Sequence, residues 1–152
     1  MVDLMDTYVE NRERVQPNHA NNLNTAHGGN VMKWLDEVGA MSAIRFAGRD
    51  CVTARMDQIN FRRPIPVGDT TVIESYVYDA GETSIRVRLR AARENPRTGE
   101  QERTTESYAV YVAIDEDLRP VEVPDLSVRT RRGQRLREAA LDGEEPRDRG
   151  DE

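Results

Sequence analysis

The spacing of the apolar residues changes at Gly48, and this change limits the folds open to the chain. Over residues 30–47 apolar side chains recur at helical spacing, which predicts one long amphipathic helix with Gly48 as its terminator. After Gly48 the period becomes two, which is the period of a strand with one buried face. The pattern therefore predicts a helix followed by a sheet.

The stretches after Gly48 read as strands joined by short segments. The clearest is residues 83–93, where apolar side chains alternate with Arg86, Arg88 and Arg90. The predicted strands are residues 6–16 (weak and polar), 52–61, 72–78, 83–93 and 103–114. Short connections imply antiparallel pairing, so the expected fold class is α+β, with one long central helix packed on a curved antiparallel β-sheet.

Within the second of these strands the apolar phase slips by one residue. Met56 belongs to one alternation, and Ile59 and Phe61 belong to the other. A slip of this kind moves every later side chain to the opposite face of the sheet, which a β-bulge produces. The sequence therefore predicts a bulge between Met56 and Ile59.

Composition excludes several functional classes. A length of 152 residues favours a single domain, and the formal net charge of -6 argues against general nucleic-acid binding. No stretch approaches the ~20 apolar residues that span a bilayer, and the N-terminus lacks the features of a signal peptide, so we expect a cytoplasmic protein that binds no membrane. The single cysteine, Cys51, excludes an internal disulfide, and two histidines argue against a metal site.

The last part of the chain differs from the rest. Residues 127–152 are rich in Arg, Glu, Asp and Gly and poor in apolar side chains. Residues 131–141 have the spacing of a short helix, and residues 142–152 have the composition of a disordered segment. We therefore divide the chain into a folded domain at residues 1–126 and a charged tail at residues 127–152.

The residues best suited to catalysis lie at the start of the predicted helix and in the loop before it. A loop rich in asparagine leads through Gly28 and Gly29 into the helix, and Asp36 lies two turns further on. The unpaired N–H groups of a helix N-terminus bind oxyanions, and a glycine has no Cβ to obstruct the approach of a substrate. A carboxylate beside the carboxamide of Asn21 could then activate water. The plainer alternatives are a half-exposed helix aspartate and an asparagine that shapes its own loop; we expect Asn24 to cap the helix, which leaves Asn21 free.

Several short motifs, in their order along the chain, resemble those of a known family. They are Asn21, His27-Gly28-Gly29, Lys33-Trp34-Leu35-Asp36-Glu37, Val52-Thr53-Ala54, Ile59-Asn60-Phe61-Arg62-Arg63-Pro64, Val67-Gly68-Asp69, Gly81-Glu82-Thr83-Ser84-Ile85, Tyr111-Val112-Ala113-Ile114-Asp115 and Arg119-Pro120-Val121-Glu122-Val123-Pro124. Together they make residues 5–126 similar to hotdog-fold acyl-CoA thioesterases, in particular the brain acyl-CoA hydrolase group and its bacterial short- and medium-chain relatives. The chain departs from this pattern at residues 23–25, where a glycine is usual.

The resemblance implies an assembly as well as a reaction. The family forms homodimers whose sheets join edge to edge, and hexamers built as trimers of dimers. Its active site lies at the dimer interface, with the acid from one subunit and the asparagine from the other. The family separates these two residues by fifteen positions, as Asn21 and Asp36 are separated here. It implies an acyl-CoA substrate and no cofactor, since coenzyme A is part of the substrate.

On this reading each polar residue receives an expected role. Asp36 is the general base or the nucleophile, Asn21 orients the water, and Gly28 and Gly29 donate N–H groups to the oxyanion. His27 shapes the loop or donates a hydrogen bond near the carbonyl. The candidates for contact with the substrate or its CoA moiety are Thr53, Asn60, Arg62, Arg63, Thr83, Ser84 and Arg93. Arginine is also common on the solvated faces of this chain, so none of these receives a defined role.

Two alternatives remain open. A 3-hydroxyacyl-CoA hydratase or dehydratase needs a histidine placed with the acid, and His27 precedes Asp36 by nine positions on an unfavourable loop. A non-catalytic acyl-CoA-binding sensor usually carries a DNA-binding or partner domain, and the basic residues 129–137 are too short a stretch to serve as one.

Overall fold

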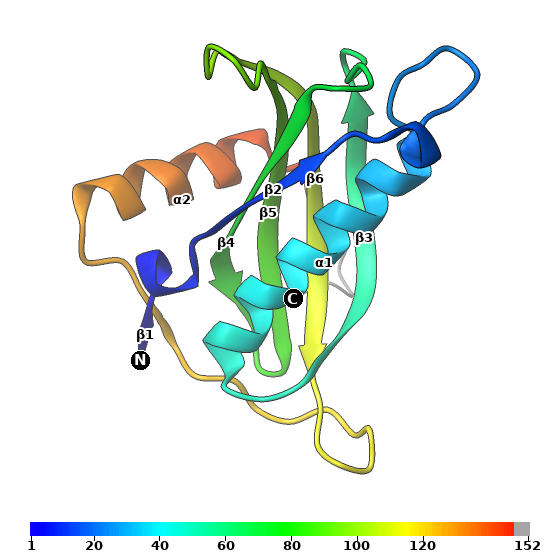
Figure 1. The fold of residues 1–152 in the computed structure, drawn as a ribbon. Helices are drawn as coiled ribbons and strands as arrows, with labels where there is room; N and C mark the ends of the chain where they lie inside the picture. The colour runs from blue at the N-terminus through cyan, green and yellow to red at the C-terminus, as the bar shows by residue number, and fades with distance from the viewer. Residues whose placement is uncertain (148–152) are drawn as a thin grey trace.

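One long helix lies across a five-stranded antiparallel sheet in the computed structural model, which describes residues 1–147 (Figure 1). The helix is α1 (Gly28–Ala47), and the strand order in the sheet is β2-β4-β5-β6-β3. These strands are β2 (Val9–Arg14), β3 (Cys51–Phe61), β4 (Thr70–Ala80), β5 (Ser84–Glu94) and β6 (Gln101–Ala113). The fold class and the order of elements predicted from the period change are confirmed.

Short elements complete the N-terminal part. β1 (Val2–Asp3) pairs in parallel with β7 (Leu126–Ser127), and 3-10 helices cover Leu4–Thr7 and Pro17–His19. The predicted strand at residues 6–16 is therefore shorter than expected. None of the helices in residues 1–147 is long and apolar enough to cross a membrane.

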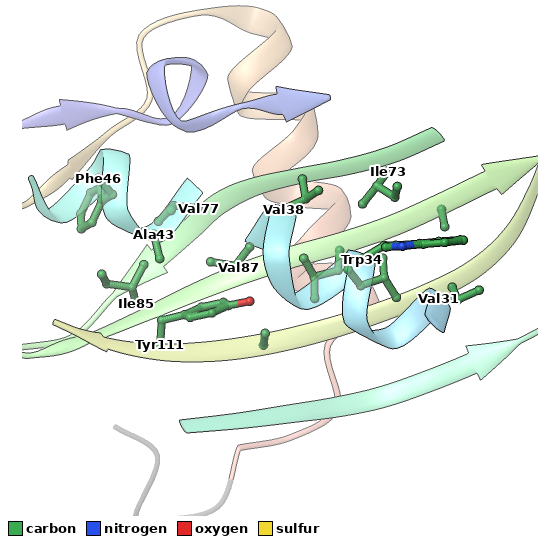
Figure 2. Close-up of a cluster of buried hydrophobic side chains, with 14 of the residues drawn as sticks. Val31, Trp34, Val38, Ala43, Phe46, Ile73, Val77, Ile85, Val87 and Tyr111 are labelled. Carbon is green, nitrogen blue, oxygen red and sulfur yellow. The ribbon is translucent and has the colours of Figure 1, made fainter. Parts of the chain in front are cut away.

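The core lies between α1 and the inner face of the sheet (Figure 2). Trp34, Leu35 and Val38 on α1 meet Val87 and Leu89 on β5, and all of these side chains are buried. Gly48 ends α1 in the left-handed conformation, with φ of 70°, and its N–H donates to the Ile44 carbonyl at 2.8 Å. The apolar stripe of residues 30–47 thus meets the sheet as predicted.

Strand β3 forms one edge of the sheet and is paired on one side by β6. Its register shifts twice, between Thr53 and Arg55 and between Asp57 and Asn60. Gln58 lies in the second shift with φ of 51°. The predicted bulge between Met56 and Ile59 is confirmed, and the first shift is a feature that the alternation did not indicate.

A second helix, α2 (Arg131–Gly143), covers part of the outer face of the sheet, opposite α1 (Figure 1). Tyrosines of the sheet hold it by its backbone: the Tyr76 hydroxyl donates to the Leu136 carbonyl at 2.8 Å, and the Tyr108 hydroxyl donates to the Ala140 carbonyl at 2.6 Å. The helix predicted at residues 131–141 is confirmed. It is packed against the domain and is not part of a detached tail.

The arginines of β5 are not on a solvated face, as the alternation had suggested. Arg86 and Arg88 are 7% and 8% exposed, and they pair with Glu144 and Glu106 respectively. Burying a cation is costly unless a carboxylate compensates it, and here the carboxylates lie on the neighbouring strand and on the segment after α2. These ion pairs join segments that are far apart in the sequence, so the alternation of residues along one strand does not predict them.

The disorder predicted from residue 142 onward is wrong for residues 142–147. The Gln58 side chain donates to the Gly143 carbonyl at 3.0 Å and accepts from the Glu145 N–H at 2.9 Å. Glu144 accepts a hydrogen bond from Tyr78 and pairs with Arg86 and Arg147. This charged segment is therefore ordered, because its charged side chains form ion pairs and hydrogen bonds. Residues 148–152 lie outside the described residues, so the prediction of disorder there stays untested.

Candidate active site

The N-terminus of α1 is capped by a histidine. The Gly29 N–H donates to Nδ1 of His27 at 3.0 Å, and the His27 carbonyl accepts from the Asn30 N–H at 2.9 Å. Since Nδ1 is the acceptor, the neutral ring carries its proton on Nε2. The prediction that Asn24 caps this helix is wrong.

This cap changes which backbone groups are free at the helix entry. The Gly29 N–H, one of the two predicted oxyanion donors, is already bound to His27. Within residues 1–147 the Gly28 N–H has no hydrogen-bond partner. Gly28 is therefore the open donor of the pair, and it sits at the positive end of the α1 dipole.

Asn21 organises the loop that precedes α1. Its Oδ1 accepts from the N–H groups of Leu23 at 2.9 Å and Thr25 at 3.2 Å, and its Nδ2 lies 3.0 Å from Thr25 Oγ1. Asn24 instead adopts φ of 61° and gives its carbonyl to the Val67 N–H at 3.0 Å. Asn21 is thus less free than predicted, since two N–H groups occupy both lone pairs of Oδ1, although Nδ2 keeps one N–H to present.

Asp36 is half-buried on the face of α1 that turns toward β3 and β6. Its Oδ1 accepts from the Thr53 hydroxyl at 2.7 Å, and the Tyr111 hydroxyl lies 3.1 Å from the same oxygen. Oδ2 accepts no hydrogen bond from the described residues. One oxygen is therefore anchored, and the other is open to a water or a substrate.

The open N–H and the open carboxylate oxygen are far apart within one protomer. Asp36 follows Gly28 by eight positions, and at 1.5 Å per residue that places it about 12 Å further along the α1 axis. One thioester carbonyl cannot meet both groups across this distance. In residues 1–147 no hydrogen bond joins Asn21 to Asp36 either.

A pocket of about 240 Å³ adjoins the helix entry. Gly28 and Phe61 line it together, and a Cβ on Gly28 would lie 3.5 Å from the Phe61 ring. Arg62 and Arg63, two of the predicted CoA contacts, also line this pocket. Both arginines are more than half exposed and pair loosely with glutamates of β6, so they retain donors for an anion.

The other predicted contacts do not gather at this pocket. Thr83 and Ser84 lie at the start of β5, whereas Arg93 lies near its end and pairs with Asp69 at 3.3 Å. Nine residues of strand separate Ser84 from Arg93 by roughly 30 Å. Asn60 is exposed, and its Nδ2 donates to the Gln58 carbonyl at 3.2 Å, within the bulge.

Tyr111 belongs to the site, and the sequence pattern did not identify it. The second half of β6 is apolar on both faces, so its alternation did not indicate that Tyr111 is fully buried or that its hydroxyl reaches α1. The one available signal was Gly39, a helical glycine whose added Cβ would overlap that hydroxyl. Within residues 1–147 no group of three or more His, Cys, Asp or Glu side chains is placed to hold a metal ion.

Comparison with known proteins assigns the family. A family model described as the Thioesterase superfamily matches residues 23–100. An uncharacterized acyl-CoA thioester hydrolase of Bacillus subtilis, YkhA, is 38% identical over 119 residues, which are 78% of this chain and 69% of the relative. The chain belongs to the thioesterase superfamily. The superfamily match includes Asp36 and Thr53 but neither Asn21 nor Tyr111.

Solved structures extend the likeness over the whole thioesterase domain. An acyl-CoA hydrolase from Staphylococcus aureus, solved with butyryl coenzyme A, coenzyme A and coenzyme A disulfide, is 26% identical with a TM-score of 0.85, covering 92% of this chain and 85% of that one. A hexameric acyl-CoA thioesterase solved in its apo form is 33% identical, also with a TM-score of 0.85, over 93% of this chain and 92% of that one. These neighbours are hotdog-fold hydrolases, as the sequence motifs had led us to expect.

Proposed function

We propose that this chain is an acyl-CoA thioesterase that hydrolyses acyl-CoA to a carboxylic acid and coenzyme A. The observation that carries the proposal is the Asp36 carboxylate, which has one oxygen anchored by two hydroxyls and the other open. The acyl-CoA hydrolase names of the relatives and neighbours support the substrate class.

The reaction needs only water besides the substrate. Asp36 Oδ2 takes a proton from a water held with the help of Asn21, and the water oxygen attacks the thioester carbonyl. The Gly28 N–H stabilises the oxyanion of the tetrahedral intermediate. When the intermediate collapses, the C–S bond breaks, and the CoA thiolate takes the proton held by Asp36. In the alternative course Oδ2 attacks the carbonyl itself, the C–S bond breaks, and CoA leaves as a thiolate. Water then hydrolyses the mixed anhydride to the free acid and the Asp36 carboxylate, and the CoA thiolate takes the proton released.

Spacing supports the choice of residues. Three of the neighbouring structures are alanine variants of the S. aureus hydrolase. One is at an asparagine, one is at an aspartate fifteen positions after it, and one is at a threonine a further seventeen positions on. Asn21, Asp36 and Thr53 of this chain have the same spacing. This agreement supports roles for all three, with Thr53 acting through Asp36.

The proposed site is shared by two copies of the chain. The separation of about 12 Å between Gly28 and Asp36 leaves each protomer with half of the chemistry. A second copy that pairs along the free edge of β3 would bring its own helix entry, with Asn21 and Gly28, toward Asp36. We propose a homodimer as the minimum unit and, given the hexameric neighbour, a hexamer built as a trimer of dimers. A cytoplasmic location remains part of the proposal.

The hydratase alternative has less support once the contacts of His27 are considered. His27, the histidine that such chemistry needs, uses Nδ1 to cap α1. No observation on the described residues favours the sensor either, so thioester hydrolysis is the function that we carry forward.

Release of free thiol from a panel of acyl-CoAs tests the proposal. We expect turnover by the native protein, a fall in kcat of ~10²–10⁴-fold in Asp36→Asn, and a smaller fall in Asn21→Ala. Asp36→Asn keeps the size of the side chain, so its thermal unfolding serves as the folding control. Undiminished turnover in Asp36→Asn would overturn the mechanism, and tight binding of acyl-CoA by the native protein without thiol release would favour the sensor.

A further inference from the structure

The Tyr111 hydroxyl is a polar group in the middle of an apolar core. The side chain is fully buried and lies between β6 and α1 among the aliphatic residues of the main core (Figure 2). A buried hydroxyl costs free energy unless it is hydrogen-bonded. Among the described residues its acceptors are two oxygens of one residue, the Asp36 carbonyl at 3.0 Å and Asp36 Oδ1 at 3.1 Å. Packing alone would be served equally well by phenylalanine.

The sheet register places Tyr111 and Thr53 on Asp36 together. The two residues are directly opposite each other in the antiparallel pairing of β3 with β6, so their side chains share the face that meets α1. The β3 register shifts immediately afterwards, between Thr53 and Arg55. Both hydroxyls therefore converge on the same carboxylate oxygen from neighbouring strands.

Helix α1 is shaped to admit this contact. A Cβ on Gly39 would overlap the Tyr111 hydroxyl and lie 2.8 Å from Leu89 Cδ2. Glycine inside a helix is less favourable than alanine by roughly 0.5–1 kcal/mol, so the close approach of Tyr111 is obtained at a cost to the helix. The absence of a side chain at this position lets the hydroxyl reach one turn back to Asp36.

The two donors differ in their surroundings. Thr53 is exposed on an edge strand, where water competes for its hydroxyl, whereas Tyr111 is enclosed by the core. A hydrogen bond in a low-dielectric interior is stronger than one in contact with water. Burial and the adjacent Asp36 also raise the pKa of Tyr111 well above its usual range, so the hydroxyl keeps its proton and remains a donor throughout the pH range of an enzyme assay.

We infer that Tyr111 is a positioning residue of the thioesterase site, which fixes the Asp36 carboxylate through Oδ1 so that Oδ2 faces the reacting water. Tyr111 does not itself touch the substrate. The inference rests on the proposed function and adds to it a residue outside the family match, which ends at residue 100.

The test compares Tyr111→Phe with a matched loss of a hydroxyl. The control is Tyr108→Phe, which removes a buried tyrosine hydroxyl from the same strand, where it donates to the Ala140 carbonyl on the opposite face of the sheet. A hydrogen bond to a charged group corresponds to about tenfold or more in an equilibrium constant. For Tyr111→Phe we expect kcat to fall about tenfold and KM for acyl-CoA to stay within about twofold, because the carboxylate loses its orientation while substrate binding is untouched. For Tyr108→Phe we expect no change in kcat or KM.

A second variant tests the same contact from the helix side. Gly39→Ala keeps the hydroxyl but displaces it, so kcat should fall with KM unchanged, and the fold loss of kcat in the double variant should be smaller than the product of the two single losses. This arm also applies if Tyr111→Phe fails to fold, which thermal unfolding would reveal.

The outcomes separate this inference from the proposed function. Full turnover in Asp36→Asn would remove the basis of both. An inactive Asp36→Asn together with native kcat in Tyr111→Phe would overturn the positioning role alone. An equal loss of kcat in Tyr111→Phe and Tyr108→Phe would reduce Tyr111 to a core residue.

Discussion

At the scale of single residues, the two carboxylate oxygens of Asp36 differ in their hydrogen bonds. Asp36 Oδ1 is held by the hydroxyls of Thr53 and Tyr111, and Oδ2 is left open. Holding one oxygen fixes the rotamer of the carboxylate, and this removes a conformational search from every turnover. The open Oδ2 is the observation from which we propose Asp36 as the residue that acts on water.

Thr53 gives a prediction at this scale. Thr53→Val keeps the shape of the side chain but removes the hydroxyl that lies 2.7 Å from Asp36 Oδ1, whereas Thr53→Ser keeps the hydroxyl. Because Thr53 is exposed, we expect kcat of the valine variant to fall by about three- to tenfold, and the serine variant to stay close to the native protein. Steady-state thiol release measures both. Equal activity of the two variants would show that the Thr53 hydroxyl does not act on Asp36.

At the scale of elements, α1 serves both the core and the site. Its N-terminus is capped by His27, its middle carries Asp36, and Gly39 admits Tyr111 from β6. One rigid helix therefore sets the position of the carboxylate relative to the sheet. The loop before it is tied to the turn after β3 by hydrogen bonds from Ala26 and Val67, so the two meet at the same end of the sheet (Figure 1).

The cap of α1 leads to a prediction about His27. His27→Ala removes the acceptor of the Gly29 N–H and should lower the free energy of unfolding by about 0.5–2 kcal/mol. His27→Ser supplies a different capping oxygen and should restore most of the stability. Denaturant unfolding at fixed protein concentration measures the stability, and thiol release measures the activity. Loss of turnover in a stable His27→Ser would indicate a chemical role for the imidazole.

Helix α2 is held by tyrosines whose burial makes the stability sensitive to alkaline pH. Burial raises the pKa of Tyr76 from 10.0 to about 12. The unfolded chain therefore loses the Tyr76 proton at lower pH than the folded protein does. The contribution of Tyr76 to stability is complete below about pH 10, and it falls between about pH 10 and 12 by at most about 1.4 kcal/mol per pH unit.

The measurement compares the free energy of unfolding at pH 8 and pH 11 in the native protein and in Tyr76→Phe. The variant loses the hydrogen bond to the Leu136 carbonyl at both pH values, so the informative quantity is the change with pH. We expect a smaller fall in the variant. The same fall in both proteins would show that Tyr76 does not contribute to the alkaline loss.

At the scale of the whole molecule, a single protomer is incomplete. The outer edge of β3 has no partner strand in the described part of the chain, and Val52 and Phe61 on this strand are 45% and 50% exposed. Exposed apolar side chains on an unpaired edge favour association with another chain. In the proposed mechanism, the distance along α1 between Gly28 and Asp36 is bridged by this association.

Complementation between inactive variants tests the shared site. Co-expressed Asn21→Ala and Asp36→Ala chains form mixed dimers in which one site has both Asp36 and the partner's Asn21 intact. With random pairing, half of the dimers are mixed and half of their sites are complete, so we expect about a quarter of native kcat per protomer. Each variant alone is the control. Activity no higher than the mean of the two variants would place the whole site within one protomer.

The local parts of this structure were accessible from the sequence. The helix at residues 30–47, the strand runs and the bulge near Gln58 follow from the positions of apolar residues along the chain. Asp36 and Gly28 could be proposed from the sequence because their chemistry and their place relative to a helix N-terminus are also local properties. The burial of Arg86 and the ordering of residues 142–147 were missed because they depend on partners in distant segments. The helix cap is a local error, because His27 lies two positions before the Gly29 N–H that it accepts.

The sequence by itself determined which segments fold as helix or strand and which carboxylate we propose as reactive, because periodicity and residue chemistry act over a few positions. Only the tertiary structure decided what holds that carboxylate. Tyr111 lies 75 positions from Asp36, and it reaches Oδ1 because the β3–β6 register places it beside Thr53 and Gly39 leaves room. Register and close approach arise when the sheet and helix pack together, and no spacing along the chain encodes them directly.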